Sequence, residues 1–163
     1  MNKLRWYAIL TGLLFLASSA PSMAVLGYQT WGIRGGIGVD PDQGIIGAHW
    51  NFGNFSRRTR LQPNFELGFG DNSTLGSLTI PVHYRFGNSP DFTPYAGGGI
   101  QLGYIDHDKP QGNSSGDWFI EPVGVVGIEW PLSGGGELFL ELDVSFGDAN
   151  DAKLLVGWMR RIR

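Results

Sequence analysis

A two-residue alternation of apolar and polar side chains runs along most of this chain and limits what it can fold into. From Leu138 to Phe146, every second residue is Leu, Val or Phe, and the residues between them include Glu141 and Asp143. Successive side chains of a strand point to opposite faces, so the alternation predicts strands with one apolar and one polar face. Gly and Pro are scattered throughout, which argues against long helices.

Clusters of turn-forming residues divide the chain after residue 24 into eight such segments. The clusters are residues 40–42, 54–58, 70–73, 87–90, 106–116, 131–136 and 147–151. This even spacing is typical of consecutive antiparallel hairpins. We therefore expect a single all-β domain, an eight-stranded antiparallel up-and-down barrel.

The first 24 residues have the features of a cleaved secretory signal. Lys3 and Arg5 precede a largely apolar run at residues 6–17, and small residues lead up to Ala24. That run is too short for a transmembrane helix, which needs about 20 residues. We expect cleavage after Ala24, which leaves residues 25–163 as the barrel; an uncleaved N-terminal membrane anchor is the alternative.

Composition excludes several classes of protein. The chain has no Cys, so disulfide scaffolds, thiolate metal sites and Cys nucleophiles are excluded. Its hydrophobic content of 42% is too high for a disordered chain. The formal charge of −3 falls to −5 once Lys3 and Arg5 are removed with the signal. Such a charge gives no basic footprint for nucleic acid.

The distribution of bulky and small residues indicates which face points inward. A soluble barrel places its apolar face inside, whereas an outer-membrane barrel turns that face toward lipid. The interior of an eight-stranded barrel is just wide enough for side chains. The apolar face carries Trp, Phe, Leu and Ile, while many of the 26 Gly lie on the polar face. This favours a transmembrane barrel with the apolar face outward; a soluble periplasmic barrel that binds an apolar ligand is the alternative.

The spacing of aromatic residues favours the same orientation. Trp118 and Trp130 share a face and lie 12 residues apart, which is roughly 40 Å along a strand and about 28 Å vertically at a tilt of about 45°. The apolar band of such barrels is about 25 Å tall, with aromatic girdles at both edges. We expect a girdle of Trp31, Trp50, Trp118, Trp130 and Trp158. The alternative is that these are core aromatics of a soluble sandwich.

The polar face would then fill the barrel. Its charged and imidazole side chains are Arg34, His49, Arg60, Glu66, His83, Arg85, Glu121, Glu129, Glu141 and Asp143. Unpaired charges in such an interior are costly, so we expect a network of ion pairs and hydrogen bonds that plugs the barrel. The alternatives are strand-end charges in water and a zinc pair at His49 and His83, which no short ligand spacing supports.

One stretch resembles a known family. Residues 93–100, Thr-Pro-Tyr-Ala-Gly-Gly-Gly-Ile, are followed by Gly103-Tyr104. This Pro-Tyr and Gly-rich entry to a strand is similar to small bacterial outer-membrane β-barrels of the OmpA/OmpX-like family, and the resemblance covers residues 25–163. The family usually ends on an aromatic residue, whereas Arg160 interrupts the final alternation here and Arg163 ends the chain.

The resemblance implies a monomer in the bacterial outer membrane, with both termini on the periplasmic side. It implies a structural or surface-interaction role, in envelope integrity or adhesion, with outer-membrane lipid and lipopolysaccharide as partners. The outer loops would be residues 40–43, 70–74, 105–117 and 147–152, which carry eight Asp and one Lys. Divalent cations are a candidate partner for this acidic rim, although Asp also serves turn formation and solubility.

No motif predicts catalysis or a cofactor. Asp106 and Asp108 resemble the start of a calcium loop, but the required Gly and final Glu are missing. A lipid A-modifying barrel enzyme is the enzymatic alternative, and that family places a His and a Ser two residues apart. Ser145 has no neighbouring His, and neither His49 nor His83 has a Ser two residues on. We therefore expect a non-enzymatic protein.

Overall fold

The computed structural model describes residues 25–39, 42–56, 58–71, 73–87, 89–107, 115–147 and 152–161. The predicted signal at residues 1–24 lies outside them. The strands are β1 (Val25–Val39), β2 (Gln43–Ser56), β3 (Thr59–Leu61), β4 (Asn64–Phe69), β5 (Ser73–Arg85), β6 (Thr93–His107), β7 (Ser115–Pro131), β8 (Gly136–Ser145) and β9 (Ala152–Arg161). Within the described residues, no helix is long and apolar enough to cross a membrane.

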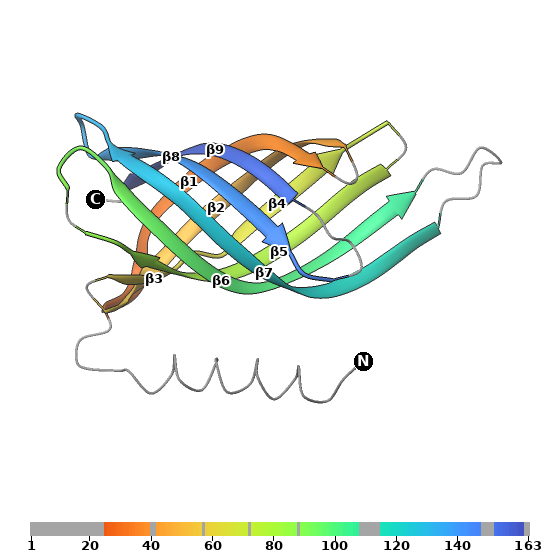
Figure 1. The fold of residues 1–163 in the computed structure, drawn as a ribbon, viewed down its shortest axis with the longest axis horizontal. Coiled ribbons are helices and arrows are strands. Elements are labelled where there is room, and N and C mark those ends of the chain that lie inside the picture. The colour runs from red at the N-terminus through yellow and green to blue at the C-terminus, as the bar shows by residue number, and fades with distance from the viewer. Residues whose placement is uncertain are drawn as a thin grey trace.

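The strands form one closed antiparallel barrel (Figure 1). Consecutive strands pair except β3 and β4, and β1 pairs with both β2 and β9, which closes the sheet. β3 and β4 each pair with β2 on one side and β5 on the other, so together they form one strand of the wall. Gln62 and Pro63 separate the two pieces, yet the Gln62 N–H still donates to the Pro81 carbonyl at 3.1 Å. The predicted eight-stranded antiparallel barrel is confirmed.

The barrel has two distinct ends. We call the end where β1 begins and β9 ends the terminal end; the connections β2–β3, β5–β6 and β7–β8 also lie there. The opposite end, which we call the loop end, carries the connections β1–β2, β4–β5, β6–β7 and β8–β9. The β7–β8 turn contains Gly134 and Gly135 with φ of 117° and 85°. Glycine adopts these positive φ values without the steric strain that a Cβ would impose.

The strands at the loop end are longer than the turn signals predicted. The expected bounds of the outer loop at residues 105–117 are wrong at both ends, because Ile105 pairs with Asp117 and His107 with Ser115. Residues 108–114 lie outside the described residues. Strand pairing thus continues past the Asp residues that were interpreted as loop. Gln43, Ser73 and Ala152 also begin strands where loop was expected.

The β6–β7 hairpin projects beyond the rest of the wall at the loop end (Figure 1, right). Pairing of β7 with β8 begins only at Val123, opposite Ser145. The hairpin carries two of the most exposed apolar side chains described, Trp118 at 72% and Ile120 at 71%. This end of the barrel is therefore uneven in height.

The apolar face of the barrel points outward. Ile33, Ile46, Ile80, Ile100 and Leu142 all lie exposed on the outer surface, while the polar residues between them are buried inside. This is the arrangement of a transmembrane β-barrel, in which lipid covers the apolar band. It contradicts the soluble alternatives, which require the large aromatics inside.

Candidate functional site

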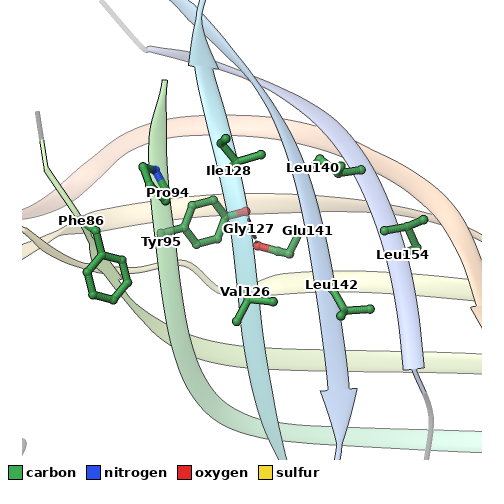
Figure 2. A pocket seen from close by; sticks show the side chains of 10 residues that line it. All are labelled: Phe86, Pro94, Tyr95, Val126, Gly127, Ile128, Leu140, Glu141, Leu142 and Leu154. Atoms are coloured by element: carbon green, nitrogen blue, oxygen red, sulfur yellow. Dashed lines mark hydrogen bonds between the residues drawn. The ribbon is translucent and has the colours of Figure 1, made fainter. Parts of the chain in front are cut away.

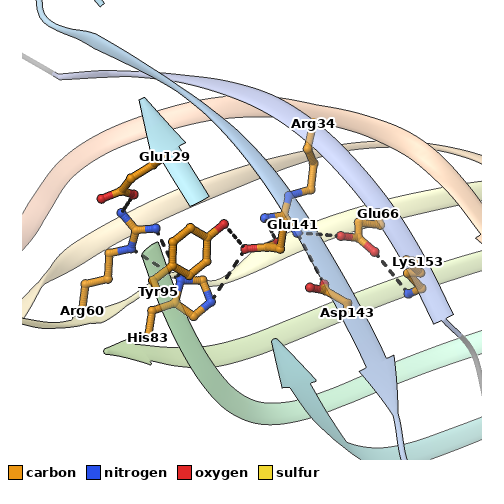
Figure 3. A network of polar contacts seen from close by, with 9 residues as sticks. All are labelled: Arg34, Arg60, Glu66, His83, Tyr95, Glu129, Glu141, Asp143 and Lys153. Carbon is orange, nitrogen blue, oxygen red and sulfur yellow. Dashed lines mark hydrogen bonds and ion pairs between the residues drawn. The ribbon is translucent and has the colours of Figure 1, made fainter. Parts of the chain in front are cut away.

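A network of charged side chains occupies the barrel interior (Figure 3). Its first part centres on Arg34 of β1. Arg34 Nη1 donates to Glu66 Oε1 at 2.9 Å, and Nη2 donates to Glu141 Oε1 at 2.6 Å. Asp143 Oδ2 lies 3.8 Å from Nη1, and Lys153 Nζ donates to Glu66 Oε2 at 3.2 Å. One guanidinium therefore joins β1 to β4 and β8.

The second part centres on Glu129 of β7, nearer the terminal end. Arg60 Nη1 donates to Glu129 Oε2 at 2.7 Å, and Arg85 forms an ion pair with the other oxygen of the same carboxylate. Arg60 is 2% exposed, whereas about a third of the Arg85 side chain reaches solvent. A single buried carboxylate thus receives two arginines, from β3 and β5.

Tyr95 and His83 connect the two parts. The Tyr95 hydroxyl donates to Glu141 Oε2 at 2.7 Å. The His83 ring stacks on Tyr95 with centroids 5.0 Å apart, and the Arg60 guanidinium lies 5.0 Å from the centre of the Tyr95 ring. Arg60 Nε also lies 3.4 Å from His83 Nδ1. A continuous chain of polar contacts therefore runs from Arg85 to Lys153.

The network balances its charges. Its cations are Arg34, Arg60, Arg85 and Lys153, and its anions are Glu66, Glu129, Glu141 and Asp143. These side chains come from every wall strand except β2 and β6. Buried charges are tolerated only when they are paired and hydrogen-bonded, so this balance is what allows so many charges inside.

Two further residues assigned to the interior are Glu121 and His49. Glu121 is buried on β7, beside Gln101 in the β6–β7 register, nearer the loop end. His49 on β2 is fully buried, and its ring packs edge-on against Phe139 with centroids 5.1 Å apart. The structure gives neither nitrogen of His49 a hydrogen-bond partner among the described residues. His49 packs against Phe139, whereas His83 stacks on Tyr95.

Tyr95 was not among the residues expected in the interior network. The glycine opposite Tyr95 was a signal for its inward position. Tyr95 pairs with Gly127, where a Cβ would collide with the Tyr95 ring. Buried apolar side chains also fill the interior, among them Phe139, Leu155 and Met159. The inward face is therefore polar at its centre and partly apolar around it.

Four of the five tryptophans assigned to the girdle form a row across adjacent strands at the terminal end. Trp31 pairs with Trp50, and Trp158 lies opposite both Ile33 and Leu138. Leu138 in turn lies opposite Trp130. Trp118 is at the other end of the barrel, where its ring lies 5.2 Å from that of Tyr104. We call the row of Trp50, Trp31, Trp158 and Trp130 the tryptophan belt.

An apolar groove of about 410 Å³ crosses the outer surface of β6–β9 (Figure 2). Val126, Ile128, Leu140 and Leu142 line it, and Gly127 forms part of its floor. Tyr95 and Glu141 also line it, and the Tyr95 hydroxyl donates a hydrogen bond to the Glu141 carboxylate. The rest of the lining is apolar and open to the outside, which suits a lipid acyl chain.

The described residues offer no metal centre. Among them, no group of three His, Cys, Asp or Glu side chains lies close enough to hold an ion. Ser145 is buried inside β8 near the loop end. The eight charged side chains of the network pair with one another and hold one another in place, which is the chemistry of a structural plug.

Comparison with known proteins gives a fold but no family. No protein-family model matches the sequence, and no curated protein matches it either. Solved structures do match, all at low sequence identity.

The similar structures are small outer-membrane barrels. Neisserial surface protein A is 13% identical with a TM-score of 0.66, over 83% of this chain and 96% of that one. The N-terminal β-barrel domain of Pseudomonas aeruginosa OprF is 12% identical with a TM-score of 0.68, over 83% and 99%. Ail, the attachment invasion locus protein of Yersinia pestis, is 10% identical with a TM-score of 0.61, over 86% and 100%. The protein has the fold of an OmpA/OmpX-like barrel.

Proposed function

We propose that the protein is a monomeric barrel of the bacterial outer membrane with a structural or surface-interaction role and no catalysis. The observation that carries this proposal is the division between the faces of the wall. Apolar residues cover the outside, while the interior holds eight mutually paired charged side chains. Such a barrel is held in lipid and closed along its axis.

The interior supports a mechanical role. Arg34 of β1 bridges to β4 and β8, with which β1 does not pair. Glu129 of β7 bridges to Arg60 of β3 and Arg85 of β5, strands with which β7 does not pair. These links resist distortion of the wall, which suits a protein that contributes to envelope integrity. They also occupy the axis through which a solute would have to pass.

The loop end supports a surface role. The β6–β7 hairpin extends above the other strands and would stand furthest from the membrane. Among similar barrels, Ail has been solved in complex with the heparin analogue sucrose octasulfate. In this chain the loop end carries Asp42, Asp71 and Asp117, so cationic partners or divalent cations that bridge lipopolysaccharide fit it better than a sulfated polymer.

Gel mobility in detergent tests the proposal. We expect the protein in the outer-membrane fraction, with an unboiled sample that migrates differently from a boiled one, because the hydrogen-bonded barrel survives detergent until it is heated. A soluble periplasmic protein with no heat-dependent shift would overturn the membrane location. Hydrolysis of lipid A by the purified protein would overturn the non-catalytic role.

A further inference from the structure

Arg160 points to the opposite face from the other Lys and Arg side chains that the structure describes in the strands. The remaining Lys and Arg side chains described in the strands, Arg34, Arg60, Arg85 and Lys153, all face inward and pair with carboxylates. Arg160 follows the inward Met159, which is 1% exposed, and itself lies exposed on the outward face. The alternation of β9 thus places one arginine on the surface that lipid covers.

The depth of Arg160 makes this position tolerable. It lies at the end of β9, opposite Trp31 on β1 and Gly136 on β8. Trp31 packs edge-on against Trp158 with ring centroids 6.0 Å apart, so Arg160 is within the tryptophan belt. Tryptophan collects at the level of lipid headgroups, and there an outward arginine destabilises a barrel far less than it does at mid-bilayer.

Arg160 lies next to a second hydrogen-bond donor. A Cβ at Gly136, the residue opposite Arg160 on β8, would lie 3.0 Å from Trp158 Nε1. The indole N–H of Trp158 therefore packs over the strand position opposite the arginine. A guanidinium and an indole N–H are both hydrogen-bond donors, which is the donor set that a phosphate accepts.

The charges around Arg160 favour one class of phosphate-bearing headgroup. In the described parts of β8, β9 and β1, the outward positions hold Gly, Ala, Val, Leu, Ile and Trp besides Arg160, and no carboxylate. A zwitterionic headgroup would bring its own ammonium group with no anion on this face to receive it. A headgroup with net negative charge has no ammonium group, and its phosphate can pair with Arg160.

We propose that Arg160, between Trp31 and Trp158, binds the phosphate of an anionic phospholipid such as phosphatidylglycerol in the leaflet at the terminal end. The site rests on the proposed membrane location. It commits to a phospholipid because Arg160 is the one cation at the described outward positions of β8, β9 and β1, and one guanidinium matches the single phosphate of such a headgroup.

Lipid competition tests the site. The full chain, purified from membranes, is equilibrated in micelles with equal amounts of phosphatidylglycerol and phosphatidylcholine, and the retained lipid is measured by native mass spectrometry. We expect about a five-fold preference for phosphatidylglycerol in the unaltered protein, the effect of one basic group at a membrane surface. Arg160→Gln should reduce the preference to near one-fold, and Arg160→Lys should retain most of it.

Arg58→Gln is the matched control, because Arg58 is an exposed arginine in the β2–β3 turn at the same end. It removes the same charge and should leave the preference unchanged. Equal retention of both lipids by the unaltered protein, or an equal loss in Arg58→Gln, would overturn the site. So would displacement of phosphatidylglycerol by lipopolysaccharide that depends on Arg160, since lipid A phosphate would then be the ligand. A heat-dependent gel shift separates the two proposals: if it is present without lipid preference, only the site fails.

Discussion

Arg34 reaches past its neighbouring strand β9 to contact Glu141 on β8, with Nη2 2.6 Å from Oε1. On its other side it reaches past β2 to Glu66 on β4. Neither contact is between paired strands, so this guanidinium ties together parts of the wall that backbone hydrogen bonds leave unconnected. Both partners are about 1% exposed, so water offers little compensation if the arginine is lost.

The first prediction concerns this arginine. Arg34→Met should lower the free energy of unfolding by about 3–5 kcal/mol, because it leaves buried carboxylates without their cation. Urea unfolding in detergent micelles, followed by the loss of the heat-dependent gel shift, measures this. In a double-mutant cycle, adding Glu141→Gln should recover part of the loss, because it removes a charge that has lost its partner. A loss no greater than that of Arg58→Gln would contradict the structural role of the network.

The second prediction concerns a close approach at Gly32. A Cβ at this position would collide with the Trp158 carbonyl oxygen and with the His49 ring. Gly32→Ala should therefore destabilise the barrel by about 1–3 kcal/mol, the usual cost of overpacking. Gly44→Ala is the control, because the nearest atom to its Cβ would be the Phe69 carbonyl oxygen at 3.9 Å. Equal urea midpoints for the two variants would show that the interior relaxes around the added methyl group.

The alternation in sequence was enough to assign faces correctly. Arg34, Glu66 and Glu141 all lie on the inward phase of their segments, and the structure buries all three. The reason is that side-chain direction depends only on position along a strand, with a period of two. Side-chain volume also indicated which face points inward, because many bulky residues cannot fit together in a narrow interior, whereas lipid accommodates them.

The partners within the interior could not be predicted in the same way. Which carboxylate meets Arg34 depends on the register of several strand pairs and on the tilt that closes the barrel, and neither is encoded in one segment. The predicted strand ends were wrong for a related reason. Asp106 and Asp117 favour turns locally, yet β6 and β7 continue to pair through them because the hairpin gains a backbone hydrogen bond at each step.

The third prediction tests which face meets lipid. Ile80 lies halfway along β5, 46% exposed and opposite Ile100. Ile80→Lys should cost about 2–4 kcal/mol of folding free energy in a bilayer, whereas Leu132→Lys, in the β7–β8 turn, should cost about 0–1 kcal/mol. Guanidinium unfolding in phospholipid vesicles measures both. Equal effects would mean that the middle of β5 is in water, which no membrane barrel of this orientation allows.

The fourth prediction concerns the two aromatic edges. In variants that retain a single tryptophan, either Trp118 or Trp130, fluorescence should be quenched more by a spin label near the headgroups than by one deep in the acyl chains. The physical reason is their separation along β7, which roughly equals the apolar thickness at the usual tilt. If Trp118 escapes quenching by every lipid label, the β6–β7 hairpin carries it into water and the loop-end girdle lies lower on the wall.

The fifth prediction concerns conduction. The described interior is occupied at its centre by Arg60, Tyr95, Glu141 and Phe139, each no more than about 2% exposed. Ions would have to displace paired charges to pass, at a cost set by the desolvation of each partner. The protein reconstituted in planar bilayers should therefore give no steady single-channel currents at voltages where a general porin, run as the positive control, conducts. Steady currents from the unaltered chain, lost or altered in size in Arg34→Met, would mean that the network forms a constriction in an open pore and not a plug.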